Sequence, residues 1–326
     1  MKESQALEEI NKLKQDIQNF QLQSPSDLTG EVVKSWEIED NPLTTTFECF
    51  DNVLKNKLRG KLGLFIGKGG CKKSLFAQQI SKKNSVNGHR SIYSTMEMPA
   101  TQLVERLIDM SFTDDENNFY GYNASYFLEK EYQREPEQIK SVVENGLKSM
   151  FGDKFMISRK SRMTASDYES LIIAHNKKYK EPVSILIVDG LSMMGGDKGE
   201  KDDYTTNSGQ LKDLANKYNI FIALICHVTK ICTRHQRNTS DYIRGSEKIL
   251  DNCDFLFQLS LCQDESSING DECEYSEDLG YIRLYDKRGS GTTKDIIYKF
   301  DKQKLELKES ILEPYIFNFK DKSKKF

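Results

Sequence analysis

The chain has 326 residues, enough to bury a sizeable core in one large domain or two ordinary ones. Hydrophobic residues make up 37% of it and charged residues 30%, as in soluble globular proteins, and the net charge of −3 excludes a broadly basic surface. Any nucleic-acid binding must therefore come from local basic loops. The seven cysteines form no C-x-x-C pair and no cluster with histidine, which predicts reduced thiols in a cytoplasmic protein. The apolar runs are too short to span a bilayer.

The first predicted element is an amphipathic helix over residues 4–20, where Leu7, Ile10, Ile17 and Phe20 fall on one helical stripe. The polar stretch SPSD then breaks the pattern, and a connector of roughly twenty residues follows. Such a helix either folds back onto its own domain or docks as an arm on a neighbouring subunit, and the sequence leaves both open. We assign residues 1–44 to this helix and its linker.

From residue 45 onward, predicted strands and helices alternate. Short apolar runs predict strands over residues 61–67, 90–96, 154–159, 183–190 and 220–228, and a helical pattern follows each of the first four. Thr164 or Ser166 is the expected N-cap of the helix after the third strand. The near-continuous apolar run of the fourth strand is typical of a strand covered on both faces. The alternation predicts a mainly parallel, twisted α/β sheet with helices on both faces.

Residues 281–309 show a different pattern, because alternating apolar positions flank the turn KRGSGT. This predicts an antiparallel hairpin at one edge of the sheet. Residues 113–153 are polar and helix-biased, as an insertion would be. We assign residues 45–320 to one α/β domain and residues 321–326 to a basic, solvated tail.

The stretch GLFIGKGGCKKSLF, residues 63–76, nearly matches the phosphate-binding pattern G-x-x-x-x-G-K-[ST]. A strand that turns through glycines into a helix offers backbone N–H groups to phosphate, and Lys73 would then reach the β- and γ-phosphates while Ser74 would bind Mg²⁺. Lys72 stands where the pattern has glycine, and a positive φ there would cost about 1–3 kcal/mol and weaken nucleotide binding. The alternative is a glycine turn with solvated lysines. The expected nucleotide contacts are Gly67, Gly69, Gly70, Cys71, Lys72, Lys73, Ser74 and Leu75.

Three further candidates lie at the ends of predicted strands, where α/β sheets bind ligands. Asp189 is placed to hold Mg²⁺ through water, or else caps a turn. Glu97 is placed to act as a base that activates the attacking water. His227 could sense a γ-phosphate by hydrogen bonding, although a lone histidine after an apolar strand is more often a satisfied core residue.

Together the motifs GKGGCKKS, YSTMEMPATQLVERL, SILIVDGLSMM, LANKYNIFIALICHVTK, SDYIRGSEKI and LYDKRGSGTTKDIIYKFDK resemble the RecA-fold motor domain of DnaB-type replicative helicases. The resemblance is as close to the helicase half of phage primase-helicases and covers roughly residues 45–310, with MEMP as its most specific element. It implies that Lys73 and Ser74 bind ATP and Mg²⁺, that Asp189 is the Walker B carboxylate and that Glu97 is the catalytic base. It places His227 where the family links the γ-phosphate to a DNA-binding loop. Arg288 falls at the position of an arginine finger that reaches a neighbour's ATP.

The loop after His227 concentrates positive charge in an otherwise slightly acidic chain. Its basic residues, Lys230, Arg234, His235, Arg237 and Arg244, would grip the phosphates of single-stranded DNA without reading bases, or else form a solvated loop. The loop over residues 195–208 occupies a second DNA-facing position in the family. Here it is acidic on balance, which argues against a strong grip.

Three features depart from the family pattern. Lys72 replaces the loop glycine, and Asp286 stands where the family has Lys or Arg two residues before the finger. In place of a primase or helical collar domain, we expect only the helix over residues 4–20 ahead of the motor.

The resemblance implies an ATP-dependent DNA helicase of replication that forms a hexameric ring. It would use a separate primase or loader and act in a bacterium, or as a phage protein in the host cytoplasm. One rival hypothesis is a RecA-family ATPase without unwinding activity. The other is a degenerate P-loop protein that acts as a DNA-binding accessory.

Overall fold

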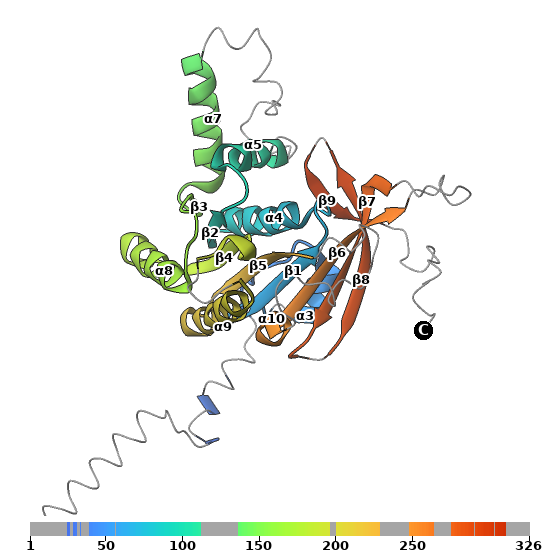
Figure 1. Ribbon diagram of the computed structural model, residues 1–326. Coiled ribbons are helices and arrows are strands. Elements are labelled where there is room, and N and C mark those ends of the chain that lie inside the picture. The colour runs from blue at the N-terminus through green and yellow to red at the C-terminus, as the bar shows by residue number, and fades with distance from the viewer. Residues whose placement is uncertain are drawn as a thin grey trace, which may run out of the picture. The chain divides into compact units, whose positions relative to one another are not determined.

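The computed structural model describes residues 25–26, 29–30, 33, 39–55, 57–111, 136–195, 200–228, 248–263, 275–289, 291–302 and 304–310 (Figure 1). The chain divides into two compact units, Met1–Pro42 and Leu43–Phe326, and the strands of the described ranges all belong to the second. Among the described helices, none is long and apolar enough to cross a membrane. None of the cysteines in these ranges, Cys49, Cys71, Cys226, Cys253 and Cys262, forms a disulfide bond.

The described part of the second unit is built on a nine-stranded sheet in the order β3-β2-β4-β5-β1-β6-β7-β8-β9. The strands are β1 (Leu62–Gly67), β2 (Arg90–Thr95), β3 (Phe155–Ser158), β4 (Val183–Asp189), β5 (Phe221–His227), β6 (Phe255–Gln263), β7 (Tyr275–Asp286), β8 (Thr293–Asp301) and β9 (Glu306–Glu309). The pairings from β3 across to β6 are parallel, and those from β6 to β9 are antiparallel. The predicted fold class, a mainly parallel sheet with an antiparallel edge, is confirmed.

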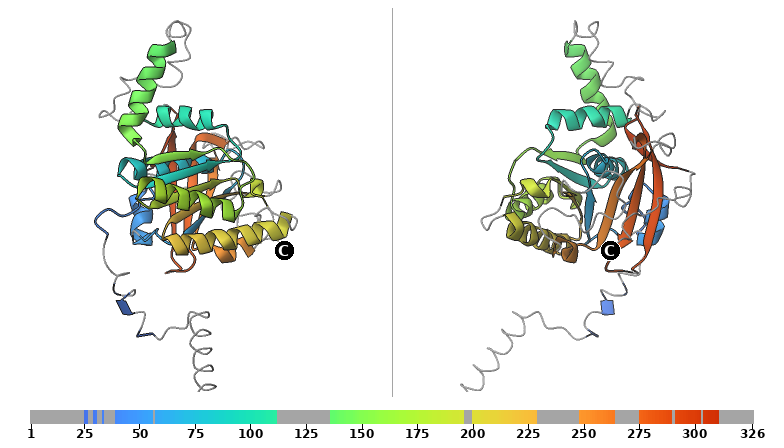
Figure 2. Two further views of the ribbon diagram at one scale, coloured as in Figure 1. Left: turned by 90° about the vertical axis from the view of Figure 1, so that its left-hand side faces the viewer. Right: turned by 45° about the vertical axis from the view of Figure 1, so that its right-hand side comes forward.

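Helices cover both faces of the parallel part, as predicted (Figure 2). One face packs against α3, α4 and α5, and the other against α8, α9 and α10. The helices are α3 (Glu48–Leu54), α4 (Lys73–Val86), α5 (Ala100–Ser111), α7 (Pro136–Phe151), α8 (Ala165–Tyr179), α9 (Glu200–Tyr218) and α10 (Lys248–Asn252), with a 3₁₀ turn η2 (Leu191–Met193). The central strands β1, β2 and β4 are buried along their whole length, which explains their continuous apolar runs.

Local signals set the ends of several helices. Thr164 is the N-cap of α8, since its side chain accepts a hydrogen bond from the Asp167 N–H while the Asp167 carboxylate accepts one from the Thr164 N–H. Helix α9 begins at Glu200, so most of the predicted loop over residues 195–208 is helical instead. The buried Tyr204 lies seven residues before the buried Leu211, and this spacing extends the apolar stripe of α9 toward its N-terminus.

The strand register brings the predicted site residues to one edge of the sheet. Gly67 at the end of β1 pairs with His227 at the end of β5. Asp189 at the end of β4 pairs with Thr95 of β2, two residues before Glu97. Because parallel strands present their carboxyl ends at the same edge, the four strand ends form one continuous rim at the start of α4.

Candidate active site

The loop between β1 and α4 adopts a geometry that depends on its glycines. A Cβ at Gly67 would lie 2.4 Å from the Leu259 carbonyl oxygen of β6, so only glycine fits at this position. Gly70 has φ +87°, in the left-handed region that favours glycine. Cys71 and Leu75 are buried in the core below the loop, so a contact of either with nucleotide would have to come from its backbone. The predicted strand–loop–helix arrangement is therefore present.

Lys73 lies at the first position of α4 and turns its ammonium group back into the loop. Its Nζ donates hydrogen bonds to the carbonyl oxygens of Gly67 at 2.8 Å and Lys68 at 3.1 Å. Burial lowers the pKa of Lys73, and the nearby Cys71, Glu97 and Asp189 oppose this shift. The ammonium is thus held at the centre of the loop, where a phosphate bound by the loop N–H groups would meet it.

Ser74 and Asp189 place two side-chain oxygen atoms beside Lys73. The Ser74 hydroxyl donates to Asp189 Oδ1 at 3.1 Å, and the phenol of Tyr93 donates to Asp189 Oδ2 at 2.7 Å. Burial raises the pKa of Asp189, while the hydrogen bonds from Tyr93 and Ser74 favour its ionised form. These hard oxygen donors fit Mg²⁺, which takes one or two protein ligands and completes its shell with phosphate and water. The described residues contain no cluster of three or more His, Cys, Asp or Glu side chains that could hold a metal ion.

Glu97 and His227 meet across the rim from β2 and β5. His227 Nε2 lies 2.8 Å from Glu97 Oε2 and 3.1 Å from Oε1. The hydrogen bond from His227 holds the pKa of Glu97 below its usual range, with burial opposing the shift. A Cβ at Gly190, which has φ +113°, would lie 3.0 Å from Glu97 Cγ, so glycine beside Asp189 makes room for this carboxylate. At neutral pH Glu97 is therefore an ionised carboxylate able to accept a proton.

Lys72 has the positive φ that the glycine of the pattern would supply. Its φ is +62° and ψ +19°, and it forms the N-cap position of α4. Its Nζ lies 4.1 Å from the centre of the Phe300 ring, a cation–π contact worth about 0.5–1 kcal/mol. Because the folded loop itself imposes this conformation, the strain is a cost to folding. The positive φ anticipated at Lys72 is present, and its effect on nucleotide binding stays a prediction.

The strain at Lys72 can be measured by comparing two substitutions. Both Lys72→Gly and Lys72→Ala remove the charge and the contact with Phe300, but only glycine relieves the left-handed conformation. We expect Lys72→Gly to be more stable to chemical denaturation than Lys72→Ala by about 1 kcal/mol or more. Equal stability of the two variants would show that the backbone at residue 72 carries no strain.

Arg288 lies at the opposite end of the sheet from the loop. It follows β7, whose last residue Asp286 pairs with Phe255 of β6, and Phe255 pairs with Gly63, four residues before Gly67. That offset is about 13 Å along the strand. Arg288 donates a hydrogen bond to the Asp251 carbonyl oxygen near the end of α10. The described site residues of the rim are thus out of its reach within one chain.

Asp286, which departs from the family pattern, organises the turn that carries Arg288. It is 5% exposed, and its Oδ1 accepts a hydrogen bond from the Gly289 N–H at 2.8 Å. A Cβ at Gly289 would lie 2.2 Å from Asp286 Oδ2, so this turn requires glycine after the arginine. The side chain at position 286 therefore points into the turn and fixes its shape.

Several predicted residues lie outside the described residues. They are the basic residues Lys230, Arg234, His235, Arg237 and Arg244, the helix over residues 4–20 and the tail over residues 321–326. Tyr93 is the site residue that the sequence reasoning missed. The signal for it was a tyrosine in the middle of a fully buried strand, because a buried phenol needs a hydrogen-bond partner.

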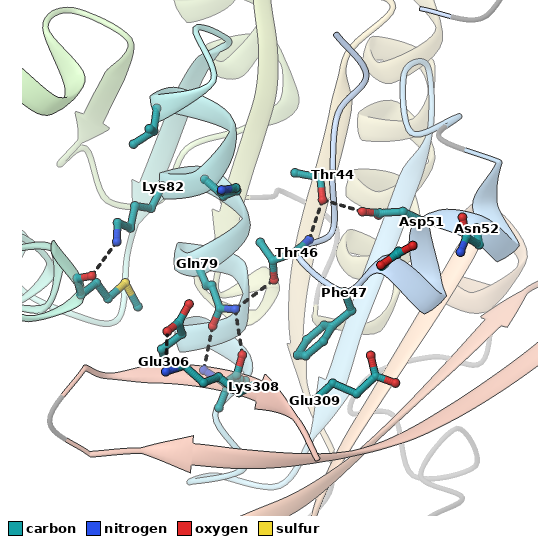
Figure 3. A pocket seen from close by; sticks show the side chains of 15 residues that line it. Thr44, Thr46, Phe47, Asp51, Asn52, Gln79, Lys82, Glu306, Lys308 and Glu309 are labelled. Carbon is teal, nitrogen blue, oxygen red and sulfur yellow. Dashed lines mark hydrogen bonds and ion pairs between the residues drawn. The ribbon is translucent and has the colours of Figure 1, made fainter. Parts of the chain in front are cut away.

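A pocket of about 540 Å³ lies away from this rim, between the C-terminal half of α4, the residues before and within α3, and β9 (Figure 3). There the Gln79 carboxamide bonds to Thr46 Oγ1 and to both the N–H and the carbonyl of Leu307, which ties α4 to the edge strand. None of the predicted site residues lines it. We place the candidate site at the loop because the reactive groups converge there.

The fold is that of a RecA-like ATPase domain, with a P-loop at the end of its central strand. Among solved structures, an isolated ATPase domain is similar with a TM-score of 0.67 and 15% identity, over 87% of this chain and 98% of that one. A DnaB-like replicative helicase, in a structure that describes its interactions with primase, is similar with a TM-score of 0.65 and 16% identity, over 88% of this chain and 67% of that one. A search of curated proteins found no match.

The sequence matches the DnaB-like helicase C terminal domain over residues 42–309, and the chain belongs to that family. The resemblance expected from the motifs is thereby confirmed. Membership identifies the chain as an NTP-hydrolysing enzyme of the replicative helicase type.

Proposed function

We propose that this chain is an ATP-driven DNA helicase that translocates along single-stranded DNA as a ring, in DNA replication. In this proposal the loop over residues 67–75 holds the phosphates of ATP, Ser74 and Asp189 hold Mg²⁺, and Glu97 takes a proton from the attacking water. Bound Mg²⁺ would neutralise charge on the β- and γ-phosphates. Lys73 binds and orients the phosphates beside it.

The observation that carries the proposal is the pairing of Glu97 with His227 at 2.8 Å beside the P-loop. His227 ends β5, and the chain continues directly into the basic loop proposed to grip DNA. A hydrogen bond from this strand to the candidate base links the position of that loop to the protonation and orientation of Glu97. This arrangement gives DNA a physical route to control hydrolysis, as a motor requires.

The position of Arg288 supports the proposed ring. Because it lies far from the P-loop of its own chain, a finger role requires a neighbouring subunit arranged head to tail. The arm over residues 4–20 would dock on that neighbour in our proposal. The solved relative described with primase supports a separate primase as partner. Arg288 would then contribute to ATP hydrolysis only within an assembled ring.

The rivals make different predictions on a forked DNA substrate with two single-stranded tails. The proposed helicase separates the strands in the presence of ATP and Mg²⁺, and a Glu97→Gln variant, which keeps the shape of the side chain, does not. ATP hydrolysis without strand separation would favour a RecA-family ATPase that does not unwind. DNA binding without ATP hydrolysis would favour an accessory protein whose P-loop no longer supports hydrolysis.

A further inference from the structure

Tyr93 touches both residues proposed to hold Mg²⁺. Its hydroxyl lies 2.7 Å from Asp189 Oδ2 and 3.3 Å from the Ser74 carbonyl oxygen. The shorter distance identifies the carboxylate as the acceptor of its single proton. Ser74 in turn donates to the other oxygen, Asp189 Oδ1. Each oxygen of the buried Asp189 carboxylate therefore has a donor, and Tyr93 provides one of them.

The sheet register explains how Tyr93 reaches this position. Tyr93 of β2 pairs with Ile187 of β4, and Asp189 lies two residues farther along β4 on the same face. The ring is fully buried in the core and lies nearly parallel to Phe155, with ring centres 6.5 Å apart. A phenylalanine would fill the same space, so the packing does not require the hydroxyl. Its contribution is the bond to Asp189.

The hydroxyl is a permanent donor. A carboxylate oxygen can only accept a hydrogen bond, so the Tyr93 phenol is the donor in its 2.7 Å contact with Asp189 Oδ2. Because its ring is fixed by packing, the phenol restricts rotation of the Asp189 carboxylate. Because the phenol is neutral, it leaves the negative charge of the carboxylate available to a cation. Groups that hydrogen-bond to a metal-binding side chain in this way orient it, and their loss typically weakens metal binding about 10–100-fold.

We propose that Tyr93 is a positioning residue for Mg²⁺ binding, because it holds the Asp189 carboxylate with Oδ1 beside the Ser74 hydroxyl, the two groups that would bind the cation. This inference rests on the proposed function, because it assumes that Ser74 and Asp189 bind Mg²⁺ with the nucleotide. It assigns to the hydroxyl a role in the affinity for Mg²⁺ and none in the affinity for the nucleotide alone.

The test is Tyr93→Phe, which removes one oxygen atom and keeps the ring. Binding of a fluorescent ATP analogue is followed by anisotropy while Mg²⁺ is titrated, so the readout does not depend on hydrolysis. We expect the half-saturating Mg²⁺ concentration to rise about 10-fold, with analogue binding in EDTA unchanged. The matched control is Tyr168→Phe, since Tyr168 is equally buried but its hydroxyl bonds to Ser94 Oγ at 2.9 Å.

The outcomes separate this inference from the proposed function. A Mg²⁺ titration of Tyr93→Phe that matches the wild type overturns the inference, and so does an equal shift in Tyr168→Phe, which would show a general packing effect. Weaker analogue binding by Tyr93→Phe in EDTA would contradict a role confined to the cation. A wild-type protein that binds no ATP analogue, with or without Mg²⁺, would overturn the proposed function itself.

Discussion

Replacing Lys73 is expected to lower the rate of ATP hydrolysis at least about 100-fold, the loss typical when a fixed donor to developing charge is removed. The Lys73 residue is 4% exposed and its ammonium is fixed by the carbonyl oxygens of Gly67 and Lys68, so water cannot substitute for it easily. Lys73→Ala leaves these carbonyls without that donor and also removes packing. Lys73→Met also removes the ammonium group with its charge and hydrogen bonds, but it keeps most of the buried apolar stem.

Both variants should be inactive in a steady-state hydrolysis assay, and Lys73→Met should retain more of the wild-type thermal stability than Lys73→Ala. The matched control is Lys83→Ala, an exposed lysine on the same helix, which should hydrolyse ATP at the wild-type rate. Substantial hydrolysis by folded Lys73→Met would contradict the assignment of this loop as the phosphate site.

Arg288→Ala is the second substitution with a large expected effect. We expect this substitution to lower the rate of ATP hydrolysis about 10³- to 10⁵-fold, because an arginine finger stabilises charge in the transition state. ATP binding to the P-loop of the same chain should be unchanged. Lys287 keeps its bonds to α10, and Asp286 keeps its bond to the Gly289 N–H, so the turn should survive the substitution. Hydrolysis and binding of a fluorescent ATP analogue measured on the same protein separate the two effects.

Mixing two inactive variants tests whether Arg288 acts on a neighbour. In a ring, the P-loop of an Arg288→Ala subunit can meet the intact finger of a Lys73→Met subunit. Random mixing at equal amounts makes about a quarter of the interfaces complete, so hydrolysis should reappear. If mixed assemblies form and stay inactive, Arg288 does not act between subunits.

The sequence predicts β1 to β5 of the parallel part well because each is a short apolar run, and a predicted helix follows the first four. It does not reveal β6, because the strand follows the five-residue α10 and so falls outside the regular alternation. It predicts one antiparallel hairpin, whereas the edge consists of β7, β8 and β9. The sequence also places the start of α9 too late, because the first turns of this helix are mostly polar and show no apolar stripe. The structure shows that Tyr204 is buried, which extends the stripe into this segment.

The candidate site is predictable where its residues end strands, because parallel strands bring those ends together. Glu97, Asp189 and His227 are of this kind. The partners of their side chains depend on sheet register and on rotamers, so the bond from Tyr93 to Asp189 becomes visible only in three dimensions. Lys72 shows the same limit, since its positive φ could be anticipated but its contact with the Phe300 ring could not.

The most direct test of the account is steady-state ATP hydrolysis with and without single-stranded DNA, beside the Lys73→Met control. We predict that DNA raises the rate of the wild-type protein, and that the rate of the control stays at background in both conditions. Hydrolysis by the wild type at the level of the control, with DNA binding retained, would contradict the account of this chain as a motor.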